Sequence, residues 1–329
     1  MKTKCLSLLV LFCAACSGGS GSSPTPIQPA MVSPPPPPAP PATTSNSLES
    51  ETDVIYGSGL VQNSAANLFL DIYQPEGECT ELRPFIVGIH GGGFTGGSKS
   101  SSPWVTNMEA AAKRGIAGLS IDYRLVGDLP VVSAEFQPLL DDLNTMADRL
   151  NLEDRQRDQL NAAVAAFEDT VTAIEWARDN AEERCLDINR FGIWGSSAGA
   201  ITTLHVAHAL DDYFIDRPEP LVAVDYWGSL FLDGLVDADG PPIYILHGTN
   251  DSTQVYEDTA LPLAAEAEAL GLPYTFYTIE NGPHGFGSVD PDRVQINGRD
   301  PLDVTLDFIE AHLTGGTPLY EVQTVVRTP

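Results

Sequence analysis

The stretch GIWGSSAGA, residues 192–200, sets two adjacent serines between a short apolar run and small residues that predict a helix. A serine hydroxyl is a weak nucleophile, so it must be held clear of its surroundings and within reach of a base. A sharp strand-to-helix turn does this, but its crowding requires very small residues two positions to either side. Gly195 and Gly199 stand at that distance from Ser197, not from Ser196. We therefore predict that Ser197 is the nucleophile.

A second glycine-rich run, HGGGF at residues 90–94, directly follows the apolar run FIVGI. Backbone N–H groups of such a loop can converge on one point and stabilise the negative oxygen of a tetrahedral intermediate. A merely flexible glycine loop is the alternative. The serine turn farther along the chain favours the catalytic interpretation.

Two later segments each place a chemically active side chain just past an apolar run. IYILHGTND ends at Asp251, and YTFYTIENGPHGF contains His284, 33 positions later. That spacing accommodates one helix and one strand, as a single α/β step requires. We predict that Asp251 orients His284, and that His284 takes the proton from Ser197.

Seven apolar runs alternate with helical patterns, which predicts a doubly wound α/β sheet of mostly parallel strands. The apolar runs cover residues 68–75, 85–93, 115–124, 190–197, 221–228, 243–251 and 274–282. The helical patterns cover residues 107–115, 167–185, 198–212, 261–271 and 301–313. Residues 127–166 interrupt the alternation with an amphipathic helical pattern. This insertion is either a cap over the active site or a decoration on the edge of the sheet.

HGGGF, DYRL (122–125), GSSAGA (195–200) and HGTND (247–251) together resemble the α/β-hydrolases of the esterase/lipase group. The similarity spans about residues 52–313 and extends to the bacterial carboxylesterases and feruloyl or acetylxylan esterases of that superfamily. It implies an eight-stranded sheet in the order 1-2-4-3-5-6-7-8 and ester hydrolysis through an acyl-enzyme, without a cofactor. It also implies an oxyanion hole made by the amides of Gly92, Gly93 and Ala198.

The residue before the nucleophile departs from the relatives, because Ser196 stands where hormone-sensitive-lipase relatives have Asp and type-B carboxylesterases have Glu. The acyl and alcohol groups of the substrate, small or polymer-linked, are therefore left open. An amidase, formamidase or peptidase with the same triad is one alternative. A catalytically inactive binding protein on the same fold is another.

The N-terminus, MKTKCLSLLVLFCAAC, has the basic start, short apolar stretch and small residues of a secretory signal. We predict a signal peptide over residues 1–15. CAAC resembles a bacterial lipobox, which implies lipidation of Cys16 and anchoring at an outer membrane; ordinary signal-peptidase cleavage is the alternative. Residues 16–50 are rich in Ser, Gly and Pro and predict a disordered tether, followed by the hydrolase domain over residues 51–329.

Two cysteines remain after this N-terminal segment, Cys79 and Cys185, and export favours a disulfide between them. Cys79 lies 11 residues before His90, and Cys185 lies 10 residues before Gly195. The implied sheet order makes the two following strands neighbours. Both cysteines should then lie below the same edge of the sheet, within bonding range.

The charge balance, 45 acidic against 17 basic residues, excludes nucleic acid as a partner and disfavours charge-driven binding to anionic lipid. No metal is expected. The H-x-x-H pair His205 and His208 lacks a third ligand, DADG (237–240) lacks the later ligands of a calcium loop, and His247 has a structural role. Five large apolar side chains either line the site or pack in the core: Phe94, Trp104, Met108, Trp227 and Phe286.

Overall fold

The computed structural model describes residues 47–62, 64–285 and 294–326. All of them belong to one compact unit, residues 43–329. The predicted signal peptide, Cys16, the tether up to residue 46 and Phe286 lie outside the described residues. No helix in the described ranges is long and apolar enough to span a bilayer.

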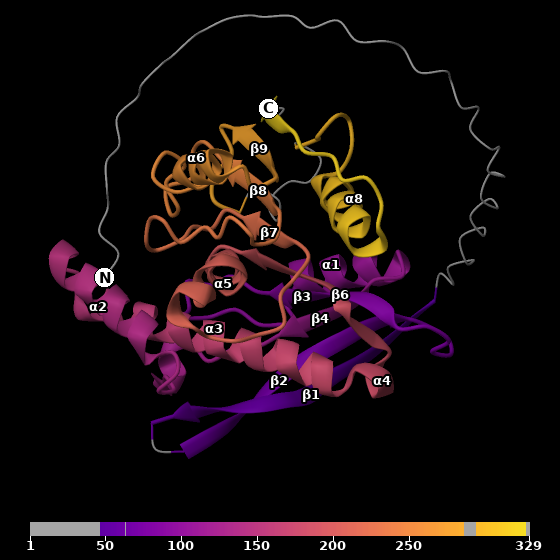
Figure 1. Cartoon of the computed structure of the whole chain (residues 1–329), viewed down its shortest axis with the longest axis horizontal. Helices are drawn as coiled ribbons and strands as arrows, with labels where there is room; N and C mark the ends of the chain where they lie inside the picture. The colour runs from indigo at the N-terminus through magenta and orange to yellow at the C-terminus, as the bar shows by residue number, and fades with distance from the viewer. Residues whose placement is uncertain (1–46, 63, 286–293, 327–329) are drawn as a thin grey trace, which may run out of the picture. The chain divides into compact units, whose positions relative to one another are not determined.

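A ten-stranded sheet runs through this unit in the order β10-β9-β8-β7-β6-β3-β4-β2-β1-β5 (Figure 1). Its strands are β1 Leu48–Val61, β2 Ser64–Pro75, β3 Arg83–Ile89, β4 Ala117–Ile121, β5 Pro130–Val131, β6 Leu186–Ser196, β7 Ala223–Tyr226, β8 Ile243–Gly248, β9 Tyr274–Glu280 and β10 Val322–Val326. Strands β3, β4 and β6 to β10 pair with one another in parallel, whereas β1 pairs antiparallel with β2 and β5, and β2 pairs antiparallel with β4. Without the two short edge strands β5 and β10, the order is β1-β2-β4-β3-β6-β7-β8-β9. When these eight strands are renumbered along the chain, this is 1-2-4-3-5-6-7-8, which confirms the predicted order.

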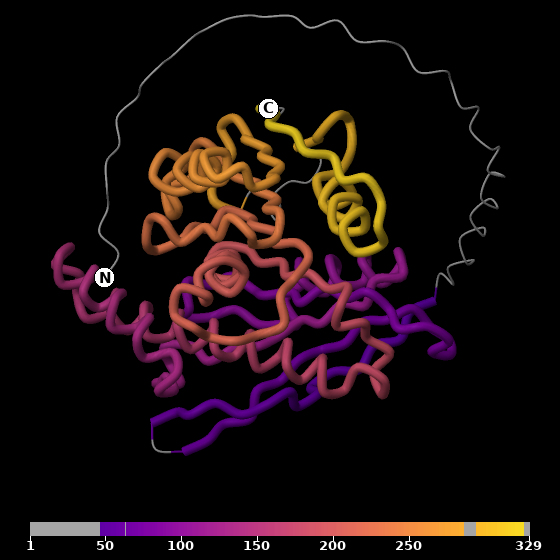
Figure 2. The backbone as a smooth tube through the Cα atoms, in the orientation of Figure 1, coloured from indigo at the N-terminus to yellow at the C-terminus, as the bar shows by residue number. Residues whose placement is uncertain are grey.

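Helices cover both faces of the sheet, because the parallel strands are apolar on both sides. The helices are α1 Ser102–Lys113, α2 Gln137–Leu150, α3 Asp154–Asp179, α4 Ala181–Arg184, α5 Ala198–Leu204, α6 Ala260–Leu270 and α8 Pro301–Thr314, with short helical turns at Val126–Asp128 (η1), His205–Ala209 and Leu210–Tyr213. Helices α2, α3, α5 and α6 pack on one face, and α1 and α8 pack on the other. Figure 2 traces the chain from the indigo β1–β2 hairpin at one edge to the orange β8 and β9.

Several boundaries differ from the prediction. Strand β1 was not predicted, and it places the start of the folded domain at Leu48 rather than residue 51. The segment 127–166 is helical, but α3 continues through residue 166 to Asp179 without a break. The insertion therefore shares one long helix with the core of the fold, and Leu160, Val164 and Phe167 of that helix are buried.

A disulfide joins Cys79 and Cys185 with 5.7 Å between their Cα atoms, as the sequence predicted. Cys185 directly precedes β6, and its carbonyl accepts the N–H of Arg83 at the start of β3 (3.0 Å). The bond therefore ties the amino ends of the two central strands together. At their opposite ends, the same two strands lead into the glycine loop and the serine turn.

Candidate active site

Ser197 occupies the turn between β6 and α5 with φ 53° and ψ −120°, a conformation that is costly for a residue with a side chain. A Cβ on Gly195 would lie 2.0 Å from the carbonyl oxygen of Gly199. A Cβ on Gly199 would lie 2.0 Å from the carbonyl oxygen of Ile89 in β3. Only glycine fits at both positions, and this is the physical origin of the G-x-S-x-G spacing.

The structure brings the three predicted side chains into contact at the carboxyl ends of the parallel strands. The Oγ atom of Ser197 lies 2.9 Å from Nε2 of His284. The Nδ1 atom of His284 lies 2.7 Å from Oδ2 of Asp251. A proton can pass from the serine hydroxyl to the imidazole while the carboxylate holds the opposite side of the ring.

Asp251 is ionised in this site although its side chain is fully buried. Burial by itself raises the pKa of a carboxyl group. Here the hydrogen bonds from His247, His284 and the backbone N–H groups of Gln254 and Thr253 outweigh that effect, and the pKa falls to about 2. Both N–H groups reach Oδ1 at 2.8 Å. These two donors were not predicted from the sequence, although an Asp that accepts the N–H two residues later is a known turn motif.

The loop after β3 brings Gly92 and Gly93 beside Ser197, and both line the same cavity. Gly92 has φ 126° and Gly93 has φ 60°, and a Cβ on Gly92 would lie 2.0 Å from the carbonyl oxygen of Gly96. Among the described residues, the amides of Gly92, Gly93 and Ala198 donate to no other group. These three N–H groups are available to an oxygen atom bound in the cavity.

A cavity of about 760 Å³ opens in front of the serine. Its apolar wall comes from Trp104 in α1, Trp227 after β7, and Pro301 and Leu302 at the start of α8. The ring of Trp227 stands edge-on to His284, with 6.2 Å between the centroids. Phe94 and Met108, which the sequence also offered as residues that either line the site or pack in the core, are buried in the core and do not line this cavity.

The three histidines to which the sequence assigns a structural role, His205, His208 and His247, are buried. His205 stacks on Phe167 with 4.5 Å between ring centroids, and its Nδ1 atom lies 2.8 Å from the carbonyl oxygen of Ile201. Burial lowers the pKa of His208 to about 3. Nε2 of His247 lies 2.8 Å from the carbonyl oxygen of Gln254. Within the described ranges no three His, Cys, Asp or Glu side chains converge as metal ligands.

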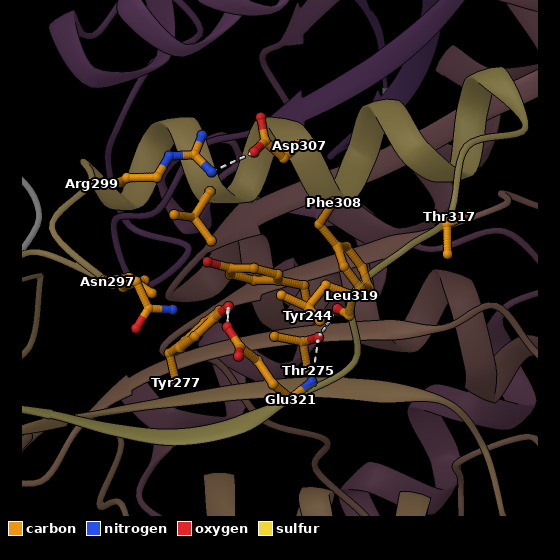
Figure 3. A pocket seen from close by; sticks show the side chains of 12 residues that line it. Tyr244, Thr275, Tyr277, Asn297, Arg299, Asp307, Phe308, Thr317, Leu319 and Glu321 are labelled. Atoms are coloured by element: carbon orange, nitrogen blue, oxygen red, sulfur yellow. Dashed lines mark hydrogen bonds and ion pairs between the residues drawn. The ribbon is translucent and has the colours of Figure 1, made fainter.

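A second cavity, of about 220 Å³, lies among β8, β9, α8 and the C-terminal segment (Figure 3). Four of its polar side chains form two pairs. Arg299 contacts Asp307 at 2.6 Å, and Tyr277 donates to Glu321. Thr275 donates to the carbonyl of Leu319. No nucleophile–base pair lines it, so the cavity at Ser197 is the candidate active site.

Comparisons with known proteins agree with this architecture. The BD-FAE family model matches residues 70–153. Acetylcholinesterase of Gallus gallus is 31% identical over 134 residues, which is 40% of this chain and 14% of that protein. Thermogutta terrifontis esterase 2 phosphorylated by paraoxon superposes with TM-score 0.57 and 22% identity over 81% of this chain and 94% of its own. An inhibited esterase B from Lactobacillus rhamnosis gives TM-score 0.57 and 16% identity, covering 83% and 88%.

These similarities and the sheet order together establish the α/β-hydrolase fold. The chain spans about a seventh of the acetylcholinesterase that it matches.

Proposed function

We propose that the protein is a serine hydrolase that cleaves carboxylic esters. The observation that carries this proposal is the chain of contacts from Ser197 Oγ through His284 to Asp251, at 2.9 and 2.7 Å. Ser197 attacks the ester carbonyl while His284 accepts its proton. The amides of Gly92, Gly93 and Ala198 then stabilise the oxyanion.

The acyl-enzyme forms as the C–O bond to the alcohol breaks and His284 returns the proton to the departing alkoxide. Water attacks the acyl-enzyme in the second half-reaction, with His284 again as the base. The carboxylic acid leaves and Ser197 regains its proton. The low pKa of Asp251 supports this cycle, because a permanent negative charge stabilises the imidazolium that forms in each half.

The lining of the cavity suits an ester substrate that carries an apolar group. Trp104, Trp227 and Leu302 offer apolar surface beside the nucleophile, and about 760 Å³ accommodates a small to medium acyl or alcohol moiety. Two of the structural relatives are esterases bound to organophosphorus inhibitors, paraoxon and a tributyrin phosphonate. The same class of reagent should react with Ser197.

A fluorophosphonate probe tests the proposal directly. The wild-type chain should be labelled at Ser197, and Ser197→Ala should lose both the label and esterase activity, the latter by at least about 10⁴-fold. Ser196→Ala is the matched control and should still be labelled. Absence of labelling in the wild type would instead favour the non-enzymatic binding protein.

Matched ester and amide substrates separate an esterase from an amidase or peptidase. p-Nitrophenyl esters of increasing acyl length, feruloyl and acetyl sugars, and the corresponding anilides should be compared on the same preparation. We expect turnover of esters to exceed that of the anilides. The reverse order would assign the protein to the amidase alternative.

We also propose that the protein acts outside the cytoplasm. The Cys79–Cys185 disulfide supports it, because stable disulfides are rare in reducing compartments. Cys16→Ala should abolish labelling by a palmitate analogue in a bacterial host and release the enzyme from the membrane fraction. Unchanged membrane association would overturn the lipid anchor and leave the hydrolase proposal untouched.

A further inference from the structure

The helical insertion contacts the glycine loop without lining the cavity at Ser197. None of the residues that line the cavity at Ser197 belongs to the insertion, residues 127–166. Instead, Nε2 of Gln159, near the start of α3, donates to the carbonyl oxygen of Gly93 at 2.8 Å. The N–H of Val126, where η1 begins, donates to the carbonyl oxygen of Phe94 at 2.8 Å. The insertion therefore holds the carbonyl of Gly93, and Val126, the residue just before the insertion, holds the next carbonyl of the loop.

The first peptide of the loop is held by the loop itself. The carbonyl oxygen of Gly92 accepts the N–H groups of Thr95 at 3.0 Å and Gly96 at 3.2 Å. The N–H of Gly93 belongs to the same planar peptide and so points away from that carbonyl, and Gly93 lines the cavity at Ser197. The direction of this N–H is thus fixed on one side by this turn.

The next peptide depends on the insertion. Gly93 and Phe94 have φ 60° and 59°, so two successive residues adopt the left-handed region. Phe94 is strained there, and Gly93 has no side chain to limit its rotation. The bond from Gln159 fixes the peptide between them. Because Gln159 is half-buried, solvent does not readily replace this donor.

From these contacts we propose that Gln159 is a positioning residue for the oxyanion hole, and that the insertion supports the glycine loop and does not act as a lid. This inference rests on the proposed esterase function. Gln159 does not touch the substrate. It holds the loop in the geometry in which the amides of Gly92 and Gly93 face the developing charge.

Asn161 provides a matched control on the same helix. Its Nδ2 atom donates to the carbonyl oxygen of Pro130 at 2.8 Å, so it makes the same kind of bond to strand β5 instead of the glycine loop. Gln159→Ala should lower kcat about 10-fold with KM within about 2-fold, since complete loss of an oxyanion donor costs about 10²–10³. Gln159→Glu should lower it further, because a carboxylate there repels the carbonyl of Gly93. Asn161→Ala and Asn161→Asp should retain wild-type kcat.

A trifluoromethyl ketone distinguishes positioning from general destabilisation, because its adduct with serine carries the oxyanion. Its inhibition constant should rise in Gln159→Ala by the same factor as kcat falls, while the denaturation midpoints of the Gln159 and Asn161 variants change alike. If Gln159→Ala matches Asn161→Ala in kcat and in ketone affinity, the inference is overturned and the esterase function stands. If the wild type neither hydrolyses esters nor binds the ketone, the proposed function fails and the inference fails with it.

Discussion

Two buried aspartates at neighbouring strands, Asp225 and Asp251, have pKa values shifted in opposite directions. Asp225 lies in β7 and Asp251 follows β8, and these strands pair in parallel. Burial raises the pKa of Asp225 to about 6, although His247 and the N–H of Gly228 pull it down. At Asp251 burial acts in the same direction, yet the pKa falls to about 2.

The difference lies in the number of hydrogen-bond donors. Asp225 accepts one N–H, from Gly228 at 2.7 Å, and its Oδ2 atom has no partner among the described residues. Both oxygens of Asp251 are occupied, by the N–H groups of Thr253 and Gln254 and by His284. The number of hydrogen-bond donors, and not the depth of burial, therefore decides whether the pKa of each buried carboxyl group lies above or below its usual value. The carboxylate with the larger number of hydrogen-bond donors is Asp251, which takes part in the proposed catalysis.

The largest expected effect comes from removing the charge of Asp251 while keeping its shape. Asp251→Asn should lower kcat by about 10⁴-fold, because an amide can donate to Nδ1 of His284 and hold the imidazole in the wrong tautomer. Steady-state kinetics on an activated ester measures the effect. A loss below about 10-fold would show that His284 does not depend on this partner.

Asp225→Asn tests the other half of the comparison. The folded-state pKa of Asp225 lies above its unfolded value, so its favourable contribution is complete below pH 4 and is lost as the pH rises to about 6. The free energy of unfolding of the variant, relative to wild type, should therefore increase by about 2 kcal/mol between pH 4 and pH 8. Denaturant unfolding across that range measures it, and kcat should change less than about 2-fold. Parallel stability curves would contradict the raised pKa.

Most of the site could be predicted from the sequence because each part is set by local turn chemistry. The crowding around Ser197 dictates Gly195 and Gly199, and apolar runs precede Asp251 and His284 in the order that the fold requires. The strand order followed from resemblance to known hydrolases. The turn at Ser197 and the segments that end at Asp251 and His284 each depend on a few residues close together in the chain, and they appear in the structure at the expected positions.

The remaining features depend on contacts between distant segments. Strand β1 was missed because glycines at 57 and 59 and two register shifts disturb its alternation. The short edge strands β5 and β10 form only by pairing with strands already in place. The partner of Gln159, 66 residues away, and the missing donor at Asp225 are likewise invisible in a local pattern. No sequence periodicity reports such long-range pairings.

The smallest expected effect concerns the acid stability that Asp251 supplies. Its folded-state pKa lies below the unfolded value, so its contribution is present above pH 4 and is lost as the pH falls toward 2. The stability advantage of wild type over Asp251→Asn should therefore shrink by about 1 kcal/mol between pH 5 and pH 3. Asp258→Asn, which removes an exposed carboxylate, is the control for loss of one charge. If the wild-type advantage stays constant over this range, or changes equally in the control, donors do not hold Asp251 ionised and its contrast with Asp225 disappears.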